Sequence, residues 1–367
     1  MIINKECMGC GACIEICPMK CIHFDKNEGF EKIVIEHEKC IKCNLCNSVC
    51  QLENDLVQHD IKELYVACQK DENNIKNSTS GGLATLLSQK MIDLGWVVVG
   101  VAWNENCEAN YDIAFSKEDI EKFRGSKYVY PKMNNIYKKT REISKTKKVL
   151  FIGLPCHIAA IKMYMKNNME NIYTIDLICH GAPQSSFLKE HLEKIGFDYF
   201  SNISFRENRE YVINVWNNNR KYRAKHYEDV YLYGFLNGLI QKKYCYSCKY
   251  AYSKRIGDIT LGDSWNKTLK DLSHTNLLSI NTDKGIELVK YIENNVILEK
   301  HDLNIFNNKD SQMKYPTKMH KKRLYFEKII KRGNFEYACK KVLFKEMMCL
   351  KVKKYLSKIK KYVKGVS

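Results

Sequence analysis

The sequence predicts an α+β or α/β fold in three parts: a small cysteine-rich module, a larger α/β domain and a basic helical tail. Nine of the 17 cysteines lie within the first 50 of the 367 residues. From about residue 60, short apolar runs alternate with helical patterns, which is typical of α/β domains. Near the end, apolar residues recur among lysines at three- and four-residue intervals, as on an amphipathic helix. We therefore place the parts at residues 1–55, 60–316 and 317–367.

The module contains two cysteine runs with the same spacing, C-x2-C-x2-C-x3-C. Three thiolates at this spacing can hold three corners of a 4Fe–4S cube, and the fourth cysteine ligates the neighbouring cube. This crossing predicts one cluster on Cys7, Cys10, Cys13 and Cys50, and a second on Cys40, Cys43, Cys46 and Cys17. Zinc knuckles are the alternative, but zinc does not require a third cysteine at this spacing.

The segment between the runs predicts a hairpin. Strand-like residues 21–24 and 32–35 flank a turn at Asn27-Glu28-Gly29. The two halves resemble the internal repeat of small bacterial ferredoxins. Gln51 stands where a proline is expected after the second run, a change that we expect to reduce turn rigidity without removing a ligand.

The first part of the α/β domain, residues 60–145, begins with a helix and a strand. Ser80-Gly81-Gly82 leads into an apolar helical stripe from Leu83 to Leu94, and Gly95 is the expected stop. The apolar run at residues 96–102 then predicts a buried strand. The order of strand, loop and helix favours a parallel sheet in this domain.

The second part, residues 146–316, repeats this order. Strands at 149–152 and 173–178 are each followed by a cysteine in a loop, Cys156 and Cys179, and then by a helix. Ligands bind at the carboxyl ends of strands in open α/β sheets. Further along, we expect a meander at residues 203–216, a helix at 230–239 and a strand at 257–263.

Four cysteines of the second part provide the ligands that a third 4Fe–4S cluster requires. Cys245 and Cys248 form a CxxC pair, and Cys156 and Cys179 complete the set. A structural zinc, or a zinc knuckle beside two unrelated thiols, is the alternative.

At these residues the chain resembles the beta subunits of coenzyme F-420-reducing hydrogenases and dehydrogenases. The resemblance implies an FAD-containing α/β domain with a 4Fe–4S cluster near the flavin, and so favours the third cluster. Ser264 departs from the family, in which an aromatic residue often follows the Gly-Asp pair. The resembling segments, in order, are residues 80–82, 125–129, 153–156, 179–181, 245–251, 257–263 and 281–285.

The candidate FAD-binding residues are Ser80, Gly81, Gly82 and Lys127. The N–H groups of a Ser-Gly-Gly turn that opens a helix can bind a pyrophosphate, and Lys127 would add a cation. The loop is not a GxGxxG fingerprint, however, and a Gly-Gly pair before a helix is often only a turn. No catalytic residue is assigned, because His180 beside Cys179 more often hydrogen-bonds a cluster sulfur or a backbone carbonyl than transfers a proton.

The tail carries most of the net charge of +18. Residues 318–367 contain 17 Lys and Arg against three acidic residues, which leaves the rest of the chain at +4. A basic amphipathic helix of this kind has two possible positions. It either lies on an anionic bilayer or packs on the rest of the protein (the body) with its lysines in water. We do not expect nucleic acid as a partner, because arginine and stacking aromatics are sparse in the tail.

Two further patterns bear on location. The first residues, Met1-Ile2-Ile3-Asn4, run directly into the cysteine motif without the pattern of a signal peptide. No run approaches the roughly 18 apolar residues of a spanning helix. We therefore expect a cytoplasmic protein, with membrane contact only at the inner face through the tail.

Together these patterns favour an iron–sulfur flavoprotein oxidoreductase. It would pass electrons between a ferredoxin-type or other one-electron carrier and a small two-electron redox substrate, either a deazaflavin coenzyme or another organic molecule. The alternative is a non-catalytic electron-transfer subunit of a larger oxidoreductase complex.

Overall fold

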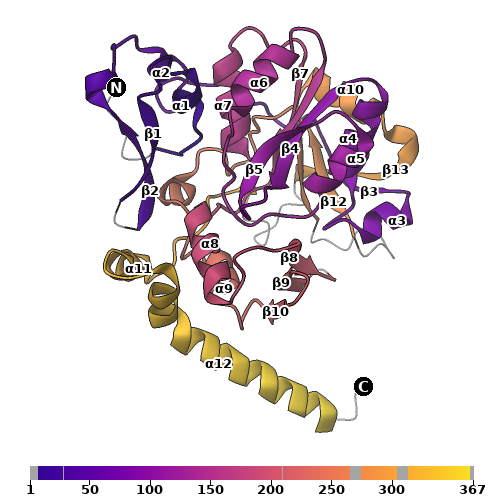
Figure 1. Cartoon of the computed structure of the whole chain (residues 1–367). Helices are drawn as coiled ribbons and strands as arrows, with labels where there is room; N and C mark the ends of the chain where they lie inside the picture. The colour runs from indigo at the N-terminus through magenta and orange to yellow at the C-terminus, as the bar shows by residue number, and fades with distance from the viewer. Residues whose placement is uncertain (1–6, 28, 209, 265–273, 304–312, 364–367) are drawn as a thin grey trace.

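The computed structural model describes residues 7–27, 29–208, 210–264, 274–303 and 313–363. Figure 1 shows a small N-terminal module beside a large sheet domain, with a long C-terminal helix that runs away from the body. The parts of the predicted module, domain and tail that fall in residues 1–6, 265–273, 304–312 and 364–367 lie outside the described residues.

The module consists of two short helices and one hairpin. Helix α1 spans Ala12–Ile16, and α2 spans Leu45–Ser48. Strands β1 (Ile22–Asn27) and β2 (Phe30–Ile35) pair antiparallel, which confirms the predicted hairpin. A 3-10 turn, η1 (His37–Lys39), connects the hairpin to the second cysteine run.

An eight-stranded mixed sheet forms the centre of the large domain. In spatial order its strands are β13 (Val296–His301), β3 (Glu63–Gln69), β12 (Asn276–Ile280), β11 (Ile259–Asp263), β7 (Ile172–Leu177), β6 (Val149–Gly153), β4 (Val97–Trp103) and β5 (Ala109–Ala114). The middle strands β11, β7, β6 and β4 pair in parallel, as predicted. The outer strands pair antiparallel, so the predicted parallel arrangement holds only for the centre.

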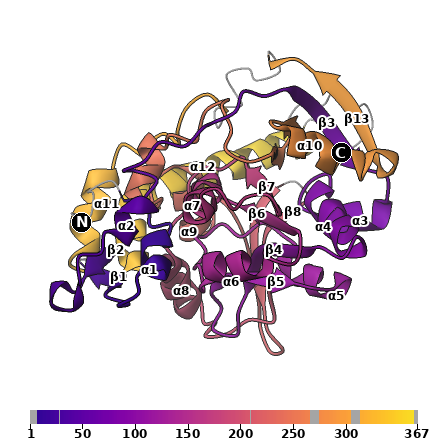
Figure 2. The same ribbon diagram turned by 90° about the horizontal axis from the view of Figure 1, so that it is seen from above.

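Helices cover both faces of this sheet (Figure 2). Helices α4 (Leu83–Asp93) and α10 (Asp283–Lys290) pack on one face, and α6 (Ile136–Ile143) and α7 (Pro155–Met165) pack on the other. Strands buried on both faces read as continuous apolar runs, which explains the sequence of β4. The connections hold α3 (Glu72–Lys76), α5 (Lys117–Ile120) and the turns η2 (Glu121–Phe123) and η4 (Glu293–Asn295).

A second, three-stranded antiparallel sheet lies below the first in the view of Figure 1. It contains β8 (Asn202–Glu207), β9 (Glu210–Trp216) and β10 (Lys221–Lys225), so the predicted meander has a third strand. Around it are α8 (Ser185–Lys194), α9 (Val230–Leu236), α11 (Arg323–Ile330) and α12 (Phe335–Val363). The turn η3 (Lys243–Ser247) instead buries Tyr244 in the cluster that contains α6 and α7.

The module packs on the α6–α7 face of the large sheet. Met8, Ala12 and Val49 are buried in one apolar cluster with residues of β4, β6, α6 and α7. Gly11 has φ 76°, and a Cβ at this position would meet Met133 Cγ at 2.9 Å. The close approach of α1 to the body therefore requires glycine at residue 11.

The two halves of helix α12 differ in how far they are buried. Phe335, Ala338, Cys339, Val342 and Leu343 are buried against the body, so packing on the enzyme accounts for the first half of the predicted apolar stripe. The second half extends beyond the body (Figure 1). None of the helices in the described part of the chain combines the length and the apolar character that a bilayer span demands.

Candidate functional site

The structure places Cys7, Cys10, Cys13 and Cys50 together in the module. Burial raises the pKa of the Cys10 thiol to about 11, and the charges of Cys7 and Cys50 add to the rise. Burial also raises the pKa of Cys13, and Cys10, Cys7 and Cys50 again contribute. Without a cation the Cys10 and Cys13 thiols stay neutral, whereas iron binds thiolates and relieves their mutual repulsion. The donor set therefore fits a cluster. We call these residues the first cysteine set.

The second cysteine set comprises Cys17, Cys40, Cys43 and Cys46. Cys17, Cys40 and Cys46 pack around the buried Cys21 and Ile22, while Cys43 is exposed. The sulfurs of Cys17 and Cys21 lie 3.5 Å apart, and Cys21 also interacts with Cys40. The sequence left Cys21 without a partner, because no spacing rule links it to either run.

The third cysteine set, Cys156, Cys179, Cys245 and Cys248, also comes together in space. Burial raises the pKa of Cys156 well above its usual value, followed by the charges of Cys248, Cys179 and Cys245. Cys156 lies in the first turn of α7 and not in the predicted loop, because the helix already begins at Pro155. The N–H groups of a helix N-terminus favour a thiolate at this position. In the part of the chain that the structure describes, no three His, Cys, Asp or Glu side chains form a site for a single metal ion.

A glycine lets two loops of the third set approach each other. Gly181 has φ 79°, and a Cβ there would meet Cys245 Cβ at 2.9 Å. The Cys179 loop, which follows β7, thereby lies directly against η3, which carries Cys245.

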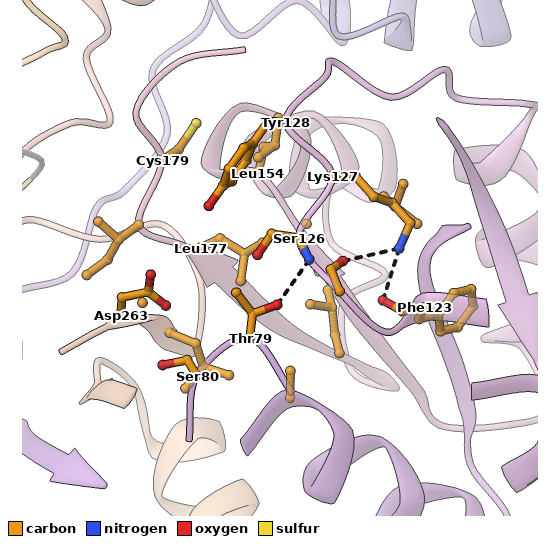
Figure 3. Close-up of a pocket in the computed structure, with 18 of the residues that line it drawn as sticks. Thr79, Ser80, Phe123, Ser126, Lys127, Tyr128, Leu154, Leu177, Cys179 and Asp263 are labelled. Carbon is orange, nitrogen blue, oxygen red and sulfur yellow. Dashed lines mark hydrogen bonds between the residues drawn. The ribbon is translucent and has the colours of Figure 1, made fainter. Parts of the chain in front are cut away.

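A cavity of about 400 Å³ opens beside the third set, at the carboxyl ends of β6, β7 and β11. This size is within the range of small-molecule and cofactor sites. Figure 3 shows Ser80, Tyr128, Cys179 and Asp263 around it. The cavity is lined by residues 77–80, 82–85, 123–129, 152–154, 177–182 and 261–264, among others.

The predicted Ser80-Gly81-Gly82 loop lies on the cavity wall at the start of α4. Gly82 has φ 76°, and a Cβ on it would meet Gln69 Nε2 at 1.8 Å. A Cβ on Gly81 would meet the Ala67 carbonyl oxygen at 2.7 Å. The two glycines are thus required by packing behind the loop. Ser80, Gly82 and Leu83 line the cavity, and Leu83 N donates to Asn276 Oδ1 at 3.2 Å. Ser80 Oγ donates to the Thr275 carbonyl at 2.6 Å.

Lys127 lines the same cavity, but its ammonium group is engaged by the backbone. Nζ donates to the carbonyl oxygen of Phe123 at 3.2 Å (Figure 3). It also donates to the carbonyl oxygens of Arg124 at 3.0 Å and Gly125 at 3.2 Å. Burial lowers the pKa of Lys127 to about 7. In this arrangement Lys127 fixes the 123–127 loop, and its contact with a cofactor phosphate stays a prediction.

Further polar groups lie near the third set, of which Arg206 and Tyr130 were not found by sequence reasoning. His180 is half-buried, and desolvation followed by the charge of Arg206 lowers its pKa to about 4. Nη2 of Arg206 lies 3.3 Å from Oδ2 of Asp263. In the sequence, Asp263 was visible only as part of the Gly-Asp motif. The hydroxyl of Tyr130 lies 3.7 Å from Cys156 Sγ.

Comparison with known proteins adds three family matches. Residues 146–305 match the C-terminal part of the beta subunit in the family "Coenzyme F420 hydrogenase/dehydrogenase", and residues 64–138 match the N-terminal part of the same protein. Residues 6–54 match "4Fe-4S dicluster domain".

Two relatives found by sequence agree with these matches. The chain is 26% identical over 193 residues to one of the subunits of the F(420)H(2) dehydrogenase of Methanosarcina mazei, covering 49% of this chain and 54% of the relative, so it spans about half of that protein's length. It is 37% identical over 76 residues to a 7Fe ferredoxin of Hydrogenibacillus schlegelii, covering 19% of this chain and 91% of the ferredoxin. A chain of the F420-reducing NiFe hydrogenase complex from Methanosarcina barkeri superposes with a TM-score of 0.49 at 14% identity, over 78% of this chain and 93% of that one.

Proposed function

Since this chain belongs to the family of coenzyme F420 hydrogenase/dehydrogenase beta subunits and carries a 4Fe–4S dicluster domain, we propose that it is an iron–sulfur flavoprotein oxidoreductase with three clusters and one FAD. Its relationship to these families makes it an iron–sulfur electron-transfer protein of the oxidoreductase type. We further propose a third cluster, an FAD and a small organic redox substrate. A deazaflavin coenzyme is one candidate for that substrate.

The observation that supports this proposal most is the position of Cys179. Its thiol belongs to the third cysteine set and also lines the cavity that the Ser80–Gly82 loop borders. A cluster held there would lie beside a ligand in the cavity. Iron–sulfur clusters supply single electrons, and a flavin can exchange one or two.

The chain's own residues would perform the binding. Cys156, Cys179, Cys245 and Cys248 would hold the third cluster, and the first turn of α7 would favour the thiolate of Cys156. The loop at residues 80–82 and the N-terminus of α4 would bind a pyrophosphate. The apolar lining of the cavity, including Leu154 and Leu177, would exclude water from the ligand.

The proposal is tested by analysis of anaerobically prepared protein. We expect about twelve iron and twelve sulfide per chain, as three 4Fe–4S clusters require, with one FAD. Cys179→Ala should remove about one third of the iron, whereas Cys107→Ala should remove none, because Cys107 belongs to none of the three sets. Equal iron in both variants, or zinc in place of iron, would contradict the proposal.

A second candidate is a non-catalytic electron-transfer subunit. The matched protein of Methanosarcina mazei is named as a subunit of a dehydrogenase, which favours this candidate. It predicts complete clusters without steady turnover of a small substrate. The proposed enzyme predicts bound flavin together with turnover of a reduced deazaflavin or viologen.

We also propose the partners and the location that accompany this function. A ferredoxin-type carrier or another redox protein would exchange electrons with the module in the cytoplasm. The exposed half of α12 would contact an anionic membrane surface, because its apolar residues lie among lysines.

A further inference from the structure

Lys242, the residue before η3, reaches from the body into its contact with the module. Its Nζ lies 4.3 Å from the centroid of the Tyr130 ring, which belongs to the body. The same atom lies 5.6 Å from the centroid of the Phe24 ring in β1 of the module. Aromatic faces attract a cation through their electron density. The two rings therefore hold the ammonium group at the contact between the module and the body.

The ammonium group of Lys242 occupies the space that Gly9 leaves open. Gly9 lies between Cys7 and Cys10, is buried and has φ 72°. A Cβ on Gly9 would meet Lys242 Nζ at 2.5 Å and Lys242 Cε at 3.2 Å. The backbone N–H of Gly9 donates to Cys7 Sγ at 3.4 Å. The cation thus lies directly against the backbone of the loop that carries the first cysteine set.

No carboxylate balances this charge by a direct ion pair in the part of the chain that the structure describes. Lys242 is nevertheless half-buried, and a charge withdrawn from water is stabilised by an opposite charge nearby. A 4Fe–4S cluster with four thiolate ligands is an anion in its oxidised and in its reduced form. A cluster on the first set would therefore supply the counter-charge of Lys242.

The first set also lies on the side of the module that faces the body. Cys10 packs against the apolar cluster that the module shares with α6 and α7, whereas Cys43 of the second set is exposed. Lys242 itself is close to the third set, because its carbonyl oxygen accepts from Cys245 N at 2.9 Å. The first set and Lys242 consequently lie between the solvent-facing second set and the third set.

A fixed positive charge acts differently on the two redox states of a cluster. The electron that reduces a cluster makes it one charge more negative, so a nearby cation stabilises the reduced state more than the oxidised state. The reduction potential of that cluster rises as a result. Because the Coulomb energy falls with distance, the nearest cluster is affected most.

We propose that Lys242 raises the reduction potential of the cluster on the first set relative to that of the cluster on the second set. An electron that the second cluster gives up, and that the first cluster accepts, is thereby favoured on the side next to the body. Lys242 forms and breaks no bond in this step and carries no electron. The inference rests on the proposed function, because it requires a cluster on each set of the module.

The test measures the reduction potentials of the loaded protein by redox titration followed by electron paramagnetic resonance. Lys242→Met removes the charge and keeps a chain of similar length. We expect the equilibrium constant for one-electron reduction of the first-set cluster to fall about tenfold, or about 59 mV, with a smaller change at the second-set cluster. Lys242→Arg keeps the charge and should keep most of the potential. Cys43→Ser alters the signal of the second-set cluster and so distinguishes the two.

Lys243→Met is the matched control. Lys243 is the next residue along the chain and is exposed, so its replacement changes the net charge by the same amount at the surface. Charges in water are screened, and we expect no selective shift of the first-set cluster in this variant. Equal shifts in Lys242→Met and Lys243→Met would assign the effect to net charge and would overturn the role of Lys242.

The outcomes separate this inference from the proposed function. Unchanged potentials in Lys242→Met at full iron content, or the same shift at both module clusters, would overturn the inference alone. A parent protein without iron on the first set would instead overturn the proposed function. If Lys242→Met does not assemble its clusters, Lys242→Gln is titrated in its place. Failure of both variants to hold the first cluster would replace the effect on potential by a purely structural role.

Discussion

At the scale of single residues, His191 shows how one buried side chain joins three helices. His191 belongs to α8, its Nε2 lies 2.8 Å from Asp229 at the start of α9, and its Nδ1 lies 2.9 Å from Glu336 in α12. Burial alone would lower the pKa of His191, but the two carboxylates outweigh burial and raise it to about 9. Tyr222 OH donates to Asp229, and Lys340 lies 3.1 Å from Glu336, which completes the network. The imidazolium is therefore part of the fold at neutral pH.

This network predicts a pH dependence of stability. The folded-state pKa of His191 lies above the unfolded value of about 6.5, so its contribution is complete below pH 6.5 and is lost as the pH rises through 9. Across this interval the wild-type free energy of unfolding should fall by about 3 kcal/mol relative to His191→Gln. Urea unfolding at several pH values measures the difference between the two proteins. The exposed His37, replaced by Gln, is the control, and parallel pH profiles for wild type and His191→Gln would contradict the prediction.

At the scale of elements, α12 shows why one sequence pattern gave two interpretations. An apolar stripe among lysines predicts an amphipathic helix, but it does not say what covers the stripe. In the structure the body covers one apolar stripe of the first half, formed by Phe335, Ala338, Cys339, Val342, Leu343 and Met347. Beyond Leu350 no such cover exists among the described residues, and Val352, Tyr355 and Ile359 are 52%, 67% and 42% exposed.

The exposed half of α12 leads to a prediction about membranes. The full chain should bind vesicles that contain anionic lipid, and should bind neutral vesicles at least tenfold more weakly, because each lysine near such a surface contributes about 1 kcal/mol. Added salt should weaken this binding. Removal of residues 351–367 should abolish it without unfolding the body, since the packed half of the helix remains. Vesicle co-sedimentation measures the effect, and equal binding by the full and shortened chains would rule out the role of the tail.

At the scale of the whole molecule, local patterns were predictable and long-range contacts were not. The hairpin of the module, the helix after Gly82 and the central parallel strands follow from turn residues and periodicity, which the sequence displays directly. The antiparallel flank formed by β12, β3 and β13 joins segments more than 200 residues apart, and no local signal encodes that pairing. The hydrogen bonds that join Gln51 to the Cys156 carbonyl and to Lys249 Nζ could not be predicted for the same reason, because these residues are distant in sequence.

The shared core predicts that the module and the large domain unfold together. Met8, Ala12 and Val49 are buried with residues of α6 and α7, so separation of the two parts would expose apolar surface on both. Calorimetry of the loaded protein should show one transition. Removal of residues 1–55 should lower the midpoint of thermal unfolding by several degrees and promote aggregation. The chain without residues 351–367 is the control, and two separate transitions in the full chain would show that the parts are independent.

The position of β3 also determines when the protein can fold during its synthesis. The ribosome makes this strand early, yet both of its neighbours, β12 and β13, come from residues 276–301. At a translation rate of about 5–20 residues per second, the nascent strand waits roughly ten seconds or more with both edges unpaired. During that interval it is exposed to other nascent chains, and a chaperone that shields short apolar strands would be most useful at this point.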